Sequence, residues 1–214
     1  MLDVESAWVH VQAAHGLCTE ADAHAVAQTA HVDRYDLAQL AAKTPDGANA
    51  LTPLLGMMRH LLVDDGAPAS ASSALHRGAT SQDIIDTALM VLARNTLQVL
   101  TEDLRRAGRG LAAIAVEHRN TTCIARSLTQ HALPTTFGLK AANWLDGINQ
   151  ALTSLTDVKL SLQWGGAVGT LASLQQVLKS QPDAPSPHEL TQELAHHLSL
   201  EAPVAPWHTN RIAI

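Results

Sequence analysis

Residues 76–87 read HRGATSQDIIDT, and this stretch decides the fold because a very long helix begins within it. Thr80 is a suitable N-cap, since its hydroxyl can accept a hydrogen bond from the free amides of the first turn. Asp83, three residues later, completes a pattern similar to a capping box and places negative charge at the positive end of the helix dipole. Such a helix N-terminus also attracts anions. The stretch therefore predicts either a carboxylate-binding loop or only a well-capped helix after a surface loop.

The sequence after Thr80 predicts one helix of unusual length. Apolar residues recur at steps of three or four from Ile85 to Ile114, and no pair of helix-breaking residues occurs before residues 120–122. Such a helix would be on the order of 60 Å long at 1.5 Å per residue. Residues 121–133 read as non-helical. Pro134 is then predicted to open a second long helix, whose apolar stripe runs to Leu162 and ends in a glycine-rich turn. Helices of this length are typical of long bundles.

The remaining elements are also predicted to be helices or loops, because no strand-like alternation of useful length occurs. The fold class is therefore all-α. The predicted helices span residues 1–17, 19–30 with Thr19 as the N-cap, 33–42, 49–63 and 188–200. The predicted loops span residues 64–73 and 181–187, the second of which carries three prolines. Residues 171–181 form a short polar segment, and residues 201–209 are predicted to be an extended arm.

Composition excludes several classes of protein. The chain has 214 residues and a formal net charge of −6, and a nucleic-acid partner would require a basic face. No apolar run is long enough to span a membrane, and the acidic first residues do not resemble a signal peptide. We therefore expect no membrane association and a cytoplasmic location, in which Cys18 and Cys123 remain reduced. The 12 histidines show no metal-ligand spacing, so no metal site is expected.

Three stretches, taken together, resemble the fumarase/aspartase superfamily. Residues 76–87 resemble its H-x-G-x-T-S-x-D-x-x-D-T block, and residues 126–140, RSLTQHALPTTFGLK, resemble its second signature region. Residues 162–172, LQWGGAVGTLA, are followed by P-W-H-T-x-R at 206–211. This last pair is most similar to the bacterial 3-carboxy-cis,cis-muconate cycloisomerase family. The resemblance implies a small N-terminal helical domain, residues 1–78, and the first part of a long-helix bundle, residues 79–214.

Two departures qualify the resemblance. The lyases of the superfamily carry a histidine where this chain has Leu128, which argues against a fumarate-releasing lyase, although the cycloisomerases typically have an aromatic residue there. The third signature, a mobile G-S-S-x-M-P-x-K-x-N-P loop, does not occur in the sequence. We therefore expect the front part of such an enzyme, with an incomplete bundle and without the C-terminal domain. Activity of the chain by itself is left open.

The resemblance implies a cofactor-free cycloisomerase of the β-ketoadipate pathway of aromatic degradation. In this reaction a carboxylate of 3-carboxymuconate adds across a double bond of the same molecule and gives 4-carboxymuconolactone. The partner is then a small polycarboxylate, with no cofactor, and the active sites are built from three subunits of a homotetramer. The candidate catalytic residues are His76, Ser81 and His131. The candidate substrate-binding residues are Asn49, Thr80, Arg126, Gln130, Trp207, His208 and Arg211.

These residue types suit a reaction in which negative charge develops on the substrate. Hydroxyls at a helix N-terminus and a bidentate arginine both bind carboxylates, and histidine can transfer a proton near neutral pH. Each side chain also has a structural alternative. Arg126 could pair with an acid of the bundle, His131 could be a satisfied loop histidine, and Trp207 and His208 could anchor the C-terminal arm.

Two other functions remain open. The first is an adenylosuccinate lyase-like activity within the same superfamily. The second is a non-catalytic helical assembly protein. In either case the apolar stripe from Ile85 to Ile114 predicts association, because a single chain has little else to cover it.

Overall fold

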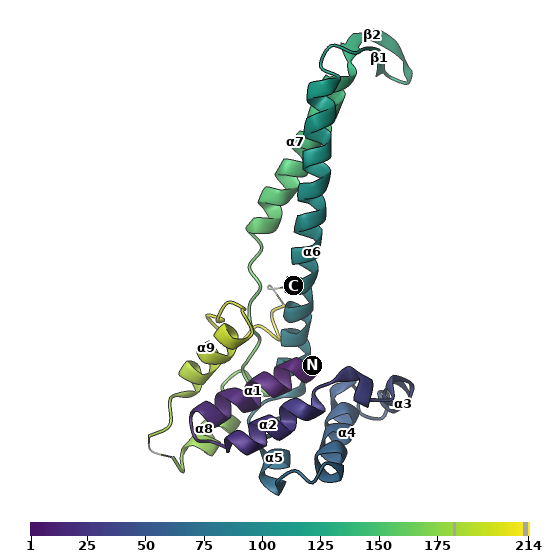
Figure 1. Ribbon diagram of the computed structural model, residues 1–214. Coiled ribbons are helices and arrows are strands. Elements are labelled where there is room, and N and C mark those ends of the chain that lie inside the picture. The colour runs from purple at the N-terminus through teal and green to yellow at the C-terminus, as the bar shows by residue number, and fades with distance from the viewer. Residues whose placement is uncertain (182, 212–213) are drawn as a thin grey trace. The chain divides into compact units, whose positions relative to one another are not determined.

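The computed structural model describes residues 1–181, 183–211 and 214, and nearly all of its regular structure is helical (Figure 1). The all-α class is thereby confirmed. The chain forms two compact units, Met1–Leu92 with Leu160–Ile214, and Ala93–Lys159. Helix α6, Ser81–Glu117, begins in unit 1 and continues in unit 2. The domain boundary between residues 78 and 79 stays a prediction about the organisation of a longer protein.

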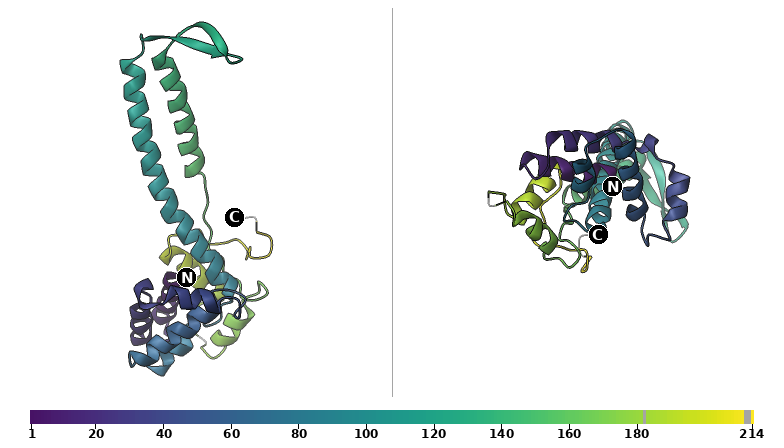
Figure 2. Two further views of the ribbon diagram at one scale, coloured as in Figure 1. Left: turned by 90° about the vertical axis from the view of Figure 1, so that its right-hand side faces the viewer. Right: turned by 90° about the horizontal axis from the view of Figure 1, so that it is seen from below.

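Unit 1 is a cluster of short helices around one apolar core (Figures 1 and 2). Helix α1 packs against α2 and α9, and α2 also packs against α4 and α5. The rings of Trp8 and Trp164 lie at the centre of this core, with their centroids 4.8 Å apart. The elements of unit 1 besides the start of α6 are α1 Leu2–Ala14, α2 Glu20–Thr29, the 3-10 helix η1 Val32–Arg34, α3 Leu37–Lys43, α4 Leu51–Asp64, α5 Ala69–Ala74, α8 Ala172–Leu178 and α9 Pro187–His197.

Side-chain caps determine where several of these helices begin. Thr19 and Asp22 form the predicted capping box of α2, and Ser186 forms a second one with Glu189 at α9. Asp36 caps α3 by accepting hydrogen bonds from two backbone N–H groups. The predicted helix 33–42 is therefore wrong at its start, because the chain forms η1 first and α3 begins only after the Asp36 cap.

Two helices of unit 1 were not predicted, one in the predicted loop 64–73 and one in the short polar segment 171–181. Residues 69–74 form α5, because Ala71 and Ala74 are completely buried and their small side chains allow close packing on α2 and α4. Residues 172–178 form α8, with Leu174 buried. Of the predicted loop 181–187, Pro182 lies outside the described residues.

Unit 2 is a helical hairpin closed by a two-stranded antiparallel sheet (Figure 1). Strands β1 Thr122–Ser127 and β2 Gln130–Thr136 pair with Arg126 opposite His131. The expectation of no strands is wrong here, and Pro134 belongs to β2 rather than to a helix. The turn consists of Leu128 and Thr129, both at positive φ, where glycine or asparagine is usual, so the sequence carries no hairpin signal there.

Helix α7, Phe137–Thr156, runs back alongside α6 within unit 2 (Figure 2). Thr136 caps it by accepting a hydrogen bond from the N–H of Leu139. Gly138 permits the close approach of α7 to α6, since a Cβ at this position would lie 2.6 Å from the carbonyl oxygen of Ala115. The predicted continuation of this helix to Gly165 is wrong. It ends at Thr156, and Leu162 is buried in the core of unit 1.

No helix among the described residues is long and apolar enough to cross a membrane.

Candidate active site

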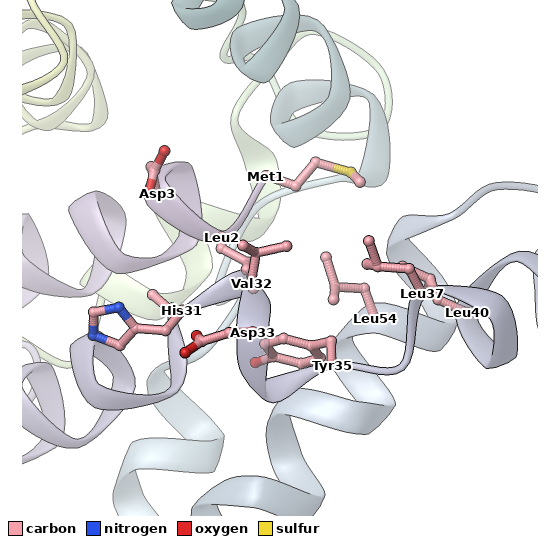
Figure 3. Close-up of a pocket in the computed structure, with 11 residues that line it drawn as sticks. Met1, Leu2, Asp3, His31, Val32, Asp33, Tyr35, Leu37, Leu40 and Leu54 are labelled. Carbon is pink, nitrogen blue, oxygen red and sulfur yellow. The ribbon is translucent and has the colours of Figure 1, made fainter.

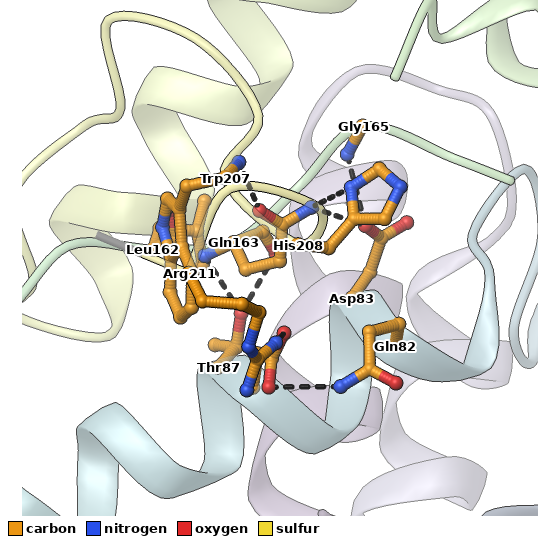
Figure 4. A network of polar contacts seen from close by, with 10 residues as sticks. Gln82, Asp83, Thr87, Leu162, Gln163, Gly165, Trp207, His208 and Arg211 are labelled. Carbon is orange, nitrogen blue, oxygen red and sulfur yellow. Dashed lines mark hydrogen bonds and ion pairs between the residues drawn. The ribbon is translucent and has the colours of Figure 1, made fainter. Parts of the chain in front are cut away.

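Asp83 is the centre of a buried polar network at the start of α6 (Figure 4). Its Oδ1 accepts hydrogen bonds from Gln163 Nε2 at 3.0 Å and from the N–H of Gly165 at 2.9 Å. Its Oδ2 accepts from the N–H groups of Thr80 at 3.0 Å and Gly166 at 2.9 Å. An ionised carboxylate can accept all four bonds. Asp83 therefore ties the first turn of α6 to the glycine-rich turn.

Thr80 and Asp83 form one of the hydrogen bonds of the predicted capping pattern, in which the backbone N–H of Thr80 donates to the Asp83 carboxylate. This amide is consequently committed to the protein and is not a donor for a ligand. The side chains of Thr80, Ser81 and Gln82 are only partly buried. The first turn of α6 thus presents two hydroxyls and an amide to its surroundings, whereas the acids Asp83 and Asp86 are buried beneath it.

The amide of Gln163 connects this network to the C-terminal arm (Figure 4). Its Oε1 accepts a hydrogen bond from the backbone N–H of Trp207 at 2.6 Å, which fixes the orientation of the amide. The Nε2 group must then be the donor both to Asp83 and to Nδ1 of His208, which lies 3.1 Å away. Because Nδ1 accepts, a neutral His208 carries its proton on Nε2.

Trp207 anchors the arm. It is 4% exposed, and its indole N–H donates to the carbonyl of Leu162 at 2.9 Å. This is the anchoring alternative raised by the sequence, and a contact between Trp207 and substrate stays a prediction. The neighbouring His208 ring is only partly buried and can present its Nε2–H outward.

A second acid of α6 holds the end of the arm. Asp86 accepts a hydrogen bond from Gln82 Nε2 at 2.9 Å and pairs with Arg211 Nη1 at 2.5 Å. Thr87 exchanges two hydrogen bonds with the backbone of Gln163, at 2.8 and 3.1 Å. The side chain of Asp86 is 2% exposed, whereas that of Arg211 is 44% exposed. Arg211 thus reaches from the surface to a buried charge, and its predicted role in substrate binding stays a prediction.

His76 is paired with a buried acid of α1. Oε1 of Glu5 lies 2.7 Å from His76 Nδ1, and Oε2 accepts from the His76 backbone N–H at 2.9 Å. Glu5 is completely buried, and the His76 side chain is 17% exposed. The predicted catalytic histidine is therefore partly exposed, and the buried carboxylate of Glu5 holds its ring and its backbone in place.

The other predicted residues lie elsewhere. Asn49 caps α4, since its Oδ1 accepts from the N–H groups of Leu51 at 2.9 Å and Thr52 at 3.2 Å. Arg126, Gln130 and His131 belong to the hairpin of unit 2, are exposed, and are not part of the Asp83 network.

Two cavities accompany these features. In unit 2 a cavity of about 340 Å³ is lined by Arg126, Thr135, Lys140, Asn143 and Trp144, among others, and its two cationic side chains suit an anion. In unit 1 a cavity of about 510 Å³, shown in Figure 3, is lined mainly by apolar side chains and by none of the predicted site residues. Within the described part of the chain, no group of three or more His, Cys, Asp or Glu side chains could hold a metal ion.

A model of the lyase family matches residues 7–200. The chain belongs to this family. The match confirms the resemblance to the fumarase/aspartase superfamily.

Similar proteins of the lyase family include cycloisomerases. The chain is 39% identical to 3-carboxy-cis,cis-muconate cycloisomerase of Bradyrhizobium diazoefficiens, over 99% of the chain and 45% of that protein. It is 37% identical to nitrosuccinate lyase of Streptomyces davaonensis, over 100% of the chain and 45% of that protein. The solved structure of 3-carboxy-cis,cis-muconate lactonizing enzyme from Pseudomonas putida has a TM-score of 0.88 and 32% identity, over 99% of the chain and 46% of that structure. The chain spans about half the length of these relatives.

Glu5, Asp86 and Gln163 are not among the predicted site residues, although Asp86 lies in the stretch 76–87 and Gln163 in the stretch 162–172. A signal existed for Glu5, because it shares the buried face of α1 with Trp8 and an acid at such a position needs a partner. The motif around Gln163 singles out this residue but not its partners, which lie 80 residues before it and 44 residues after it.

Proposed function

We propose that this chain is part of a cofactor-independent 3-carboxy-cis,cis-muconate cycloisomerase. In the reaction, a carboxylate oxygen of the substrate forms a bond to a carbon of a double bond in the same molecule. The double bond becomes single, and its other carbon, next to a carboxylate, receives a proton. The product is 4-carboxymuconolactone. The observation that carries the proposal is the Asp83 network, which joins residues 76–87 to the 162–172 stretch and to the P-W-H-T-x-R arm in a chain that is 39% identical to such an enzyme.

Charge develops on the substrate carboxylate beside the carbon that gains the proton, so the site must supply donors there. The hydroxyls of Thr80 and Ser81 and the Nε2–H of His208 are donors of this kind on unit 1. On unit 2, Arg126 offers a bidentate fork beside Lys140, and Gln130 offers an amide. His76 and His131 are the candidates for proton transfer, which commonly contributes about 10²–10⁴-fold to a rate.

The proposal includes assembly into a homotetramer whose active sites each draw residues from three subunits. Exposed apolar side chains on α6 support association, since Val99 is 64% and Val116 71% exposed. Sites of this kind would allow residues of unit 1 and unit 2 to serve different active sites. A cytoplasmic location and a small polycarboxylate substrate belong to the same proposal.

A second candidate function is the elimination reaction of a nitrosuccinate lyase, because the relative with that name is 37% identical to the chain. Adenylosuccinate lyases are also relatives, and one from Methanothermobacter thermautotrophicus is 34% identical over 81% of the chain. Leu128 stands where the lyases carry a histidine, and its apolar side chain cannot transfer a proton. This favours the cycloisomerase over adenylosuccinate cleavage.

The test is a substrate panel. The purified chain, alone and after co-refolding with a full-length cycloisomerase relative, is given 3-carboxymuconate, nitrosuccinate or adenylosuccinate. Refolded relative without the chain is the control. We expect lactone formation above this control and no fumarate from adenylosuccinate. Release of nitrite from nitrosuccinate without lactone formation would favour the second candidate, and no gain on any substrate would favour a non-catalytic assembly protein.

A further inference from the structure

We propose that Glu5 is a positioning residue that holds His76 in one tautomer, with the proton on Nδ1, and leaves Nε2 as the atom that exchanges a proton with substrate. The chemical part of this inference rests on the proposed function. The orientation of the ring follows from the contacts of Glu5 alone. Glu5 lies outside the sequence motifs, the first of which begins at His76.

The two contacts of Glu5 determine which nitrogen carries the proton. The backbone N–H of His76 can only donate, so Oε2 of Glu5 is an acceptor at 2.9 Å. An ionised carboxylate has no proton, so Oε1 is also an acceptor, and His76 Nδ1 at 2.7 Å must be the donor. This holds for both the neutral and the charged ring. Proton exchange is thereby restricted to Nε2, which makes no hydrogen bond within the described residues.

The surroundings of Glu5 supply partners for a negative charge. Glu5 lies in the first turn of α1, where the helix dipole stabilises negative charge. A completely buried carboxylate requires hydrogen-bond partners, and His76 supplies two. His76 adopts a φ of 62°, a backbone conformation that a side-chain-bearing residue rarely occupies. The two contacts with Glu5 hold His76 in this conformation.

His208 provides the contrast. Its Nδ1 accepts from the Gln163 amide, so its neutral ring has the proton on Nε2. The protein thus fixes two histidines in opposite tautomers by two different partners, a carboxylate for His76 and an amide for His208. Neutral His76 offers a lone pair at Nε2 and can accept a proton there, whereas His208 offers an N–H.

The tautomer can be measured without substrate. We would label the histidines with ¹⁵N, record long-range ¹H–¹⁵N spectra at pH 9, and assign the His76 signals by their loss in His76→Asn. We expect a protonated Nδ1 and an unprotonated Nε2. In Glu5→Gln, the backbone N–H of His76 can donate only to the amide oxygen, so the NH₂ group faces Nδ1. This variant is therefore expected to invert the tautomer of His76.

Glu193→Gln is the matched control, because Glu193 also contacts a histidine, His15 Nε2 at 2.5 Å, but is 42% exposed and belongs to none of the motifs. It should leave the His76 signals and the turnover unchanged. For Glu5→Gln, in a co-refolded mixture whose lactone formation depends on this chain, we expect kcat to fall by roughly 10²–10⁴-fold with little change in KM.

An unprotonated Nδ1 in the wild-type chain would overturn the inference, whether or not Glu5→Gln folds. An inverted tautomer with unchanged kcat would overturn its catalytic part. Absence of lactone formation with the wild-type chain contradicts the proposed function and with it the chemical role, whereas the spectra still decide whether Glu5 sets the tautomer.

Discussion

Nε2 of Gln163 lies 3.0 Å from Oδ1 of Asp83, although the two residues are 80 positions apart in the sequence. The contact joins the loop that opens α6 to the segment that returns from unit 2 into unit 1. The same Gln163 amide holds the backbone of Trp207, so one side chain aligns two motifs with the arm that follows them. The motifs are far apart in the sequence, but they form one structure in the fold.

Replacement of Asp83 by Asn should destabilise unit 1. The asparagine keeps one acceptor oxygen and turns an NH₂ group toward two donors, so buried N–H groups lose their partner. We expect a loss of about 2–4 kcal/mol in the free energy of unfolding, measured by urea denaturation. Asp46→Asn, at an exposed acid in the turn before α4, should change it by less than about 0.5 kcal/mol. Equal effects of the two substitutions would contradict the role of Asp83.

The stability of unit 1 should depend on pH through Asp22. Burial of Asp22 opposes its ionisation, but hydrogen bonds from Ser70 at 2.6 Å and from Thr19 outweigh this and lower the pKa of Asp22. A lowered pKa in the folded state stabilises the protein above the unfolded value, about 4, and this contribution disappears as the pH falls through the folded value.

Ser70→Ala tests this dependence. It should destabilise the chain by about 1–2 kcal/mol at pH 7, because a hydrogen bond to a charged group is lost. The difference from wild type should shrink as the pH falls from 5 toward 3. Ser73→Ala, at an exposed serine of the same helix, is the control and should show no such trend. A Ser70→Ala difference that stays constant with pH would contradict the account.

Much of the fold could be predicted because its signals are local. The Thr19 capping box and the apolar stripe of α6 each depend on residues three or four positions apart. The features that were missed depend on tertiary contacts. Helix α5 forms from a serine- and alanine-rich segment because Ala71 and Ala74 fit against neighbouring helices. The β1–β2 hairpin turns through Leu128 and Thr129, which no turn rule favours.

The candidate site divides in the same way. Residues inside motifs, such as His76 and Thr80, could be chosen from the sequence together with the superfamily resemblance. The contacts that hold them in place could not be predicted, even for Gln163, which itself lies inside a motif. Glu5 reaches His76 across 71 positions, and Gln163 reaches Asp83 across 80. Spacing rules describe one helix or one turn, and these supports connect different elements.

Two glycines of α7 should respond in opposite ways to alanine. At Gly138 a Cβ would lie 2.6 Å from backbone atoms of Ala115, in α6, and of Arg119, in the turn that follows α6. Gly138→Ala should destabilise unit 2 by about 2 kcal/mol or more. Gly147 has open space around it, so Gly147→Ala should stabilise the helix by up to about 1 kcal/mol. Urea unfolding followed by far-UV circular dichroism measures both, and similar effects would contradict the packing described.

The exposed apolar side chains of α6 should drive association. We expect light scattering at micromolar concentration to show a mass above the 22.7 kDa of a single chain. The double substitution Val99→Glu and Val116→Glu should shift the protein toward the monomer, because both side chains are mostly exposed in the single chain. Val204→Glu, at a fully exposed position of the C-terminal arm, should not. A monodisperse wild-type monomer would contradict the proposed assembly.

Complementation tests the central claim most directly, namely that residues 76–87 form part of a cycloisomerase active site. A full-length cycloisomerase relative is first inactivated by alanine substitutions at its own H-x-G-x-T-S motif. It is then co-refolded with this chain, and lactone formation from 3-carboxymuconate is measured. We predict that the wild-type chain restores lactone formation and that a chain with Thr80→Ala and Ser81→Ala does not. Equal lactone formation with the two chains, or none with either in a mixture shown to co-assemble, would contradict the account.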